Sequence, residues 1–222
     1  MKSKSLKEKA YNIIKSKIVS CEYPPNSFLN ENFLQEEIGV SRTPIRDAIG
    51  RLEQESLVKI IPKKGIIVTE LSINEINMIY ETRMLIEPFA IEKYGNKVDK
   101  SILISIRELF TQEYTMDNIE RLYEIDDRAH RIFITATQNK YIIQIYDNIQ
   151  VQNNRIRILS GRKESRLSQS TQEHIKIIDA VLADNYEEAA GLIKTHLQVA
   201  KNAAFSLVLS NGGWIIHPQK DH

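Results

Sequence analysis

The sequence has little of what several protein classes need. It contains one cysteine, Cys21, so it cannot form an intramolecular disulfide, which fits a reducing compartment. No apolar run approaches the ~20 residues that cross a membrane. Residues 1–9 are charged where a secretory signal would be apolar. We therefore expect a cytoplasmic protein with no membrane partner.

Neither sign of charge dominates, since the formal net charge is +1 over 222 residues. Residues 1–70 carry 12 lysines and arginines against 9 acidic residues, and the remainder carries 18 against 20. A mildly basic first third fits contact with DNA. The hydrophobic content of 42% supports packed cores in one large or two small domains.

Three helices are expected in the first quarter of the chain. Apolar residues at helical spacing mark residues 6–19 and 31–38. Gly39 can adopt the left-handed conformation that ends a helix. Ser41 or Thr43 can cap the helix that follows, whose apolar positions turn one side inward. The second and third of these helices form a helix-turn-helix.

A hairpin with a basic tip is expected next, because two β-branched runs, 57–61 and 66–71, flank Pro62-Lys63-Lys64-Gly65. In a winged helix-turn-helix, the third helix reads base edges and the hairpin contacts phosphate or the minor groove. A single arginine on such a helix is more often simply solvated, but the ordered set favours a DNA reader. The expected DNA-binding residues are Asn32, Ser41, Arg42, Thr43, Pro44, Arg46, Lys63, Lys64 and Gly65.

This arrangement resembles the winged-helix domain of the GntR family of bacterial transcription regulators. The residues that carry the resemblance are Val40 to Ala48, then Leu52-Glu53 and the tip of the hairpin. The resemblance implies that the positions of Arg42, Thr43, Arg46 and Gly65 contact operator DNA. Some family members have an arginine where this sequence has Asn32, so that contact is expected to differ.

The chain is expected to be mainly α, with a winged helix-turn-helix in residues 1–71 and an all-α antiparallel helical bundle in 72–210. Residues 211–222 are expected to form a tail. A Ser-x-x-Glu capping box at Ser170 and Glu173 is expected to start a helix. The other helices expected in the bundle span residues 72–94, 99–114, 117–137, 141–159 and 187–209.

Four side chains that can bind a metal are expected on the inward faces of these helices. Asp126 and His130 lie one turn apart, and His174 and His196 lie on the apolar stripes of later helices. A lone inward histidine is more often a hydrogen-bonded core residue, but three histidines with one aspartate favour a shared ion. This set suits a divalent transition metal, Zn²⁺ first and Ni²⁺ or Mn²⁺ as alternatives, rather than Mg²⁺ or Ca²⁺.

Arg83 also lies on an inward stripe, where a cation needs a partner. Two interpretations stay open: a salt bridge to Glu87, four residues on, or a clamp for the carboxylate of a ligand. Gln152 and Asn153 lie near the inward face of a later helix and are expected to line a polar cavity. The expected effector-binding residues are therefore Arg83, Gln152 and Asn153.

This second part resembles the FCD ligand-binding domain of the FadR subfamily of GntR regulators. The matching segments are Glu81-Thr82-Arg83 with Glu87, Asp126 to His130, Glu173 to Ala180, and Ala189 to Leu197. The resemblance implies a metal at Asp126, His130, His174 and His196 that holds a small organic carboxylate effector. It also implies a repressor that its effector releases from DNA.

We therefore expect a regulator, not an enzyme, that binds double-stranded operator DNA as a homodimer, because one recognition helix reads only a few base pairs. Three alternatives remain: a metal-dependent hydrolase using the aspartate and histidines, a regulator with a metal-free dimerisation domain, and a regulator that binds an acyl-coenzyme A. The hydrolase has no obvious second carboxylate as general base and leaves the DNA reader unexplained. The metal-ligand set argues against a regulator that binds an acyl-coenzyme A.

Overall fold

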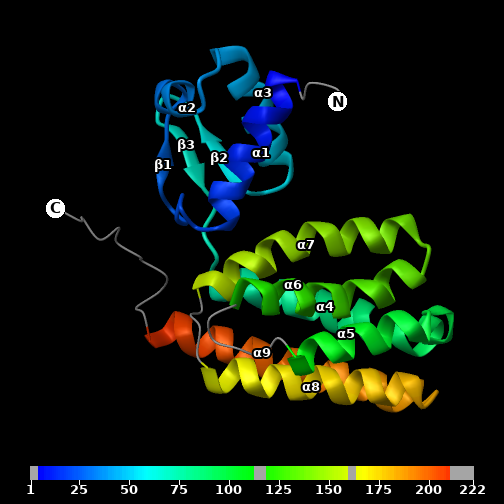
Figure 1. Cartoon of the computed structure of the whole chain (residues 1–222). Coiled ribbons are helices and arrows are strands. Elements are labelled where there is room, and N and C mark those ends of the chain that lie inside the picture. The colour runs from blue at the N-terminus through cyan, green and yellow to red at the C-terminus, as the bar shows by residue number, and fades with distance from the viewer. Residues whose placement is uncertain (1–4, 113–118, 160–163, 211–222) are drawn as a thin grey trace. The chain divides into compact units, whose positions relative to one another are not determined.

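The computed structural model describes residues 5–112, 119–159 and 164–210, which fold into two compact units (Figure 1). One unit combines the residues up to Ile73 with Val151–Leu159. The other combines Asn74–Gln150 with later residues as far as Phe205. The predicted tail, 211–222, lies outside the described residues.

The first unit is a winged helix-turn-helix, as the sequence predicts. Its sheet is antiparallel with strand order β1-β3-β2, and its first and third helices pack together over a continuous apolar core. The elements are α1 (Leu6–Val19), β1 (Phe28–Leu29), α2 (Glu31–Ile38), α3 (Arg42–Gln54), β2 (Val58–Ile61) and β3 (Gly65–Val68).

The turn between α2 and α3 follows from its residues. Asn30 caps α2 by accepting a hydrogen bond of 2.7 Å from the Phe33 amide. Gly39 ends α2 with φ at 71°, in the left-handed region predicted for it. Ser41 occupies the N-cap position of α3, but its side chain makes no capping hydrogen bond. The turn therefore presents the exposed first residues of α3.

Strand β1 is not predicted by the sequence, because two residues are too few to show alternation. Its presence gives Gly65 a structural role. Gly65 has φ at 109°, and a Cβ atom there would lie 3.1 Å from the Leu29 carbonyl oxygen. A residue with a side chain would be strained at this position. The close approach of the sheet backbone thus accounts for glycine at this position, in addition to the expected approach of Gly65 to DNA.

The described part of the second unit is entirely helical, which confirms the predicted fold class. Figure 1 shows its long helices side by side. None of the described helices is long and apolar enough to span a bilayer. The helices that follow β3 are α4 (Ile73–Tyr94), η1 (Gly95–Lys97), α5 (Lys100–Gln112), α6 (Ile119–Ala136), α7 (Lys140–Leu159), α8 (Glu164–Leu182) and α9 (Tyr186–Ser210). The end of α7, Val151–Leu159, belongs to the first unit.

The predicted capping box at Ser170 and Glu173 is wrong. Helix α8 begins at Glu164, so both residues lie inside it. A Ser-x-x-Glu pattern has no capping function in a helix interior, because the amides there already bond to the preceding turn. Both residues instead contact histidines of the predicted metal cluster.

Candidate metal centre and nucleic-acid interface

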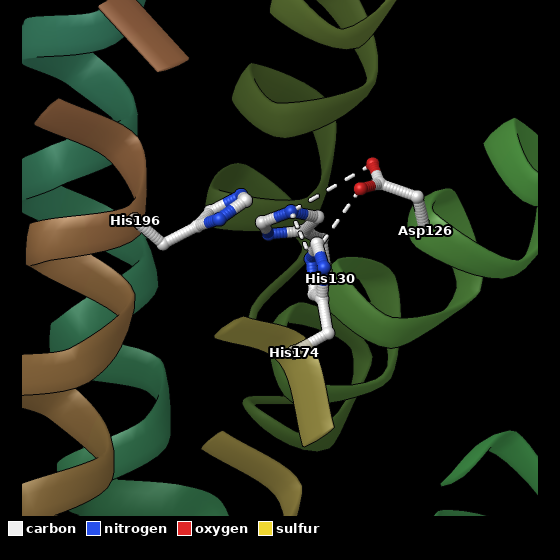
Figure 2. Close-up of side chains that lie close together, drawn as sticks. All are labelled: Asp126, His130, His174 and His196. Atoms are coloured by element: carbon white, nitrogen blue, oxygen red, sulfur yellow. Dashed lines mark hydrogen bonds and ion pairs between the residues drawn. The ribbon is translucent and has the colours of Figure 1, made fainter. Parts of the chain in front are cut away.

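The four predicted metal ligands converge in the second unit (Figure 2). Helix α6 supplies Asp126 and His130, one turn apart, while α8 supplies His174 and α9 supplies His196. One ligand atom from each of the four lies within 4.8 Å of every other. The three histidines are buried and the aspartate is partly buried. Residues from three helices thus form one polar cluster inside an apolar bundle.

The shortest contacts within this cluster join Nε2 atoms and the carboxylate. The Nε2 atoms of His174 and His130 are 3.1 Å apart. Asp126 lies 3.4 Å from Nε2 of His174 and 3.8 Å from Nε2 of His130. The ring of His196 is centred 4.4 Å from that of His174. The ring of Phe110 stacks on that of His174, with the two ring centres 5.0 Å apart, and gives the cluster an apolar neighbour.

Each imidazole is held from outside the cluster through its Nδ1 atom. Nδ1 of His130 lies 2.6 Å from a carboxylate oxygen of Glu87. Nδ1 of His174 lies 2.8 Å from the backbone carbonyl of Ser170, one helical turn earlier. Nδ1 of His196 lies 2.7 Å from the Glu173 carboxylate. All three partners are oxygen atoms suited to accept a hydrogen bond, so we assign the proton of each ring to Nδ1.

This arrangement fixes the state of the Nε2 atoms. A neutral imidazole protonated at Nδ1 presents a lone pair at Nε2. The Nε2 atoms of His130 and His174 lie 3.1 Å apart, and in these tautomers each presents a lone pair. Two lone pairs at that distance repel unless a cation lies between them. The donor set thus fits a metal, and the outer partners have the form seen around metal-bound histidines.

Burial keeps two of the three histidines, His174 and His196, neutral. Burial lowers the pKa of His174 well below its ordinary value, and burial also lowers the pKa of His196. Burial alone would raise the pKa of Glu87, but Arg83 and His130 lower it to about 2. Glu87 is therefore ionised and can accept a hydrogen bond from Nδ1 of His130, while the neutral rings of His174 and His196 are in the state that binds metals.

The salt bridge between Arg83 and Glu87 is confirmed. Arg83 Nε donates to Glu87 Oε1 over 2.7 Å, and the two side chains are 3% and 2% exposed. Nη2 of Arg83 lies 3.3 Å from Nδ1 and 3.4 Å from Nε2 of His130. Its guanidinium group therefore lies beside the metal cluster as well as beside its carboxylate partner.

The other two predicted effector-binding residues belong to the first unit. Gln152 donates to the Ser56 carbonyl over 3.2 Å and accepts from Arg155 over 2.6 Å. Asn153 is buried in the same segment of α7. The prediction of a polar cavity lined by both residues at the effector site is not supported by this placement. Helical periodicity gives the side of a helix but not which neighbour covers each turn.

The predicted DNA-binding residues divide into exposed and buried ones. Ser41, Arg42, Thr43 and Arg46 are exposed at the start of α3, and Asn32 is exposed on α2. The arginine side chains are 55% and 63% exposed. Lys63 and Lys64 are exposed in the turn between β2 and β3. Pro44 is buried in the core, so its side chain cannot be a DNA contact. Its role is the helix start, where a missing amide proton is tolerated.

Three contacts at these sites are missed by the sequence analysis. Glu87 is expected only as the partner of Arg83, yet it also holds His130. Glu173 is interpreted as a capping residue, yet it holds His196. Glu31 pairs with both exposed arginines of α3. The adjacency of Glu173 to His174 in the sequence is a weak indication that Glu173 contacts a histidine. The contact of Glu31 with the arginines crosses a turn, so no regular sequence spacing indicates it.

Two family models match the chain. The model described as bacterial regulatory proteins of the gntR family matches residues 6–68. The model described as the FCD domain matches residues 78–199, more than half of the chain. Each match falls on one of the two folded regions, the winged helix-turn-helix and the helical bundle.

Curated relatives match most of the length of the chain. The chain is 28% identical over 185 residues to the gluconate operon transcriptional repressor of Bacillus licheniformis, covering 82% of this chain and 73% of that one. It is 21% identical over 210 residues to the transcriptional repressor RspR of Escherichia coli, covering 93% and 92%. These relatives are transcriptional regulators, not enzymes.

Solved structures share the fold. A GntR regulator from Rhodococcus sp. RHA1 superposes with a TM-score of 0.79 at 19% identity, covering 91% of this chain and 99% of that one. The Zn²⁺-bound FCD domain of the regulator TM0439 superposes with a TM-score of 0.55 at 24% identity, covering 63% and 98%. From its two domains and these relatives, the chain belongs to the GntR family of bacterial transcriptional regulators and carries an FCD domain.

Proposed function

We propose that this regulator is a repressor whose affinity for operator DNA is controlled by a small organic carboxylate bound at a divalent metal. The observation that carries the proposal is the close approach of the Nε2 atoms of His130 and His174, which lie 3.1 Å apart. Asp126 and His196 complete a set of one carboxylate and three imidazoles. The relatives named as repressors support the sign of regulation.

Zinc is the metal that we infer first, with nickel or manganese as alternatives, because imidazole and carboxylate together suit all three ions. The zinc-bound form of the TM0439 domain supports this choice, since that domain has the same fold. A bound metal would supply a Lewis acid that holds an anionic oxygen of the effector. The residues of the chain would fix its geometry through the three outer acceptors, Glu87, Ser170 and Glu173.

Arg83 is the residue that we assign to the effector carboxylate. It is buried beside His130 and pairs with Glu87, and its planar guanidinium group has five N–H donors in a geometry that suits a carboxylate. A carboxylate pairing with a buried guanidinium makes a strong, oriented contact. Gln152 and Asn153 are not included in this site, given their position in the first unit.

A homodimer is part of the proposal. One recognition helix reads only a few base pairs, so two copies on an inverted repeat would give the required specificity. Met78, Leu85 and Phe89 lie on α4 at spacings of seven and four residues, and they are 45%, 70% and 42% exposed. An exposed apolar stripe of this kind fits a contact with a second copy.

We also infer that the chain belongs to the FadR subfamily of GntR regulators and that it acts in the cytoplasm.

The proposal is tested by measuring whether a carboxylic acid releases the protein from DNA. Binding sites are first selected from random-sequence duplexes, and affinity for a selected duplex is measured by fluorescence anisotropy against a panel of short mono-, di- and hydroxycarboxylic acids. We expect at least one acid to weaken binding by about tenfold for the zinc-loaded protein. Chelator-stripped protein and His174→Ala should not respond. An equal response in all three would contradict the proposal, because the acid would then act elsewhere.

A further inference from the structure

One carboxylate in the first unit pairs with both exposed arginines of the recognition helix α3. Oε2 of Glu31 lies 3.1 Å from Nε of Arg42, and Oε1 lies 2.7 Å from Nε of Arg46. Asn32, the next residue, accepts a further bond of 3.1 Å from Nη2 of Arg42. The two guanidinium groups are therefore held together by residues of the neighbouring helix α2.

The position of Glu31 suits it to orient the side chains of Arg42 and Arg46. It is the first residue of α2, directly after the capping residue Asn30, where the helix dipole favours a negative charge. Its side chain is 29% exposed, whereas those of Arg42 and Arg46 are 55% and 63% exposed. The carboxylate is thus the less exposed centre of the group, and the arginines extend outward from it.

The charge of Glu31 works against DNA binding in general. Phosphate contacts supply most of the sequence-independent affinity for DNA and carry no direct sequence information. A carboxylate between two arginines offsets one of their charges and competes with phosphate for their donors. A carboxylate at this position therefore costs affinity, and this cost must be offset by a benefit in recognition if the carboxylate serves the DNA reader.

That benefit is geometric. A guanine offers N7 and O6 to a bidentate arginine, and discrimination depends on the arginine being correctly oriented. Each guanidinium has five N–H donors, so one bond to Glu31 leaves others for a base edge. An arginine released from Glu31 could instead turn to the nearest phosphate on any sequence.

We propose that Glu31 is a positioning residue that determines DNA specificity: it holds Arg42 and Arg46 for base edges and opposes their capture by phosphates. It lowers affinity for random DNA and raises discrimination between sites. This inference concerns the DNA reader alone, so it stands or fails independently of the metal site.

The test compares Glu31→Gln with Glu36→Gln in the full chain. Glu36 is an exposed residue of the same helix, so its substitution removes the same charge without being expected to alter the arginine pairs. Affinity is measured by fluorescence anisotropy for a pool of random duplexes and for duplexes selected by the wild type, over a range of KCl concentrations. Thermal melting followed by circular dichroism checks that each variant is folded.

For Glu31→Gln we expect tighter binding to random duplexes, about threefold to tenfold, with a salt slope steeper by about one from one added phosphate contact. The ratio of affinities for selected and random duplexes should fall about tenfold, the scale of one good arginine–guanine contact. Glu36→Gln should change this ratio by less than about twofold, because an exposed charge acts only through screened long-range attraction.

A double-mutant cycle separates positioning from direct contact. If Glu31 acts through its arginines, its effect on the ratio should shrink in an Arg46→Ala background and vanish when Arg42→Ala is added. An effect that persists in the double-arginine background would overturn the proposal, because Glu31 would then touch DNA itself. Equal behaviour of Glu31→Gln and Glu36→Gln would overturn it as well, leaving an ordinary salt bridge.

Discussion

Zinc is expected to raise the free energy of unfolding of the wild-type protein by about 4 kcal/mol when the free ion is at about 1,000 times its Kd. The physical reason is that the ion binds only the folded cluster, in which three Nδ1 anchors hold the ligand atoms in place. It also relieves the repulsion between the facing Nε2 lone pairs of His130 and His174. Urea denaturation with zinc and with chelator measures the difference.

The matched variants are His174→Ala and Asp126→Asn. Loss of His174 also leaves a cavity beside Phe110, so the quantity to compare is the change caused by zinc in each variant, not stability itself. Asp126→Asn keeps the size of the side chain and removes the charge. We expect zinc to stabilise both variants much less than the wild type. An undiminished zinc effect in both would place the ion at another site.

Glu87→Ala is expected to destabilise the protein by about 3–5 kcal/mol, because it leaves the buried Arg83 guanidinium without its ionised partner. It also removes the acceptor of the His130 Nδ1 proton, so the ring can rotate or change tautomer. Loss of such an outer partner typically lowers metal affinity by about 10–100-fold. Urea denaturation of metal-free protein measures the first effect, and zinc titration against a competing chelator measures the second.

Two controls make this result specific. Glu92→Ala removes a carboxylate from the same helix, where the pair with Lys93 is 47% and 58% exposed, and should leave the denaturation midpoint unchanged. Glu87→Gln keeps the shape but not the charge, and should fall between wild type and Glu87→Ala. Normal zinc affinity in both Glu87 variants would show that His130 needs no outer partner.

The parts of this molecule that sequence predicts are those set by local physics. Apolar spacing gives α1 and α2 closely, and Gly39 ends α2 because few other residues adopt its φ of 71°. The gathering of Asp126 with His130 and His174 could be predicted because an inward polar residue needs a partner, and several such residues can satisfy one another.

The parts that sequence does not predict depend on contacts across the fold. Glu173 and Ser170 fit a capping motif, and only the real start of α8 shows that they hold histidines instead. Gln152 lies on a buried side of α7, but the segment that covers it comes from the first unit. Glu31 meets its arginines across a turn, and no periodic pattern relates them.

Elemental analysis of untagged protein purified without chelator tests the central claim most directly, with His174→Ala measured beside the wild type. The account predicts one divalent transition-metal ion per chain in the wild type, at the cluster of Asp126, His130, His174 and His196, and its loss in the variant. Wild-type protein that contains no such ion, and takes up none on addition of Zn²⁺, Ni²⁺ or Mn²⁺, would contradict it. The helical domain would then be a metal-free module, and the DNA reader would stand unchanged.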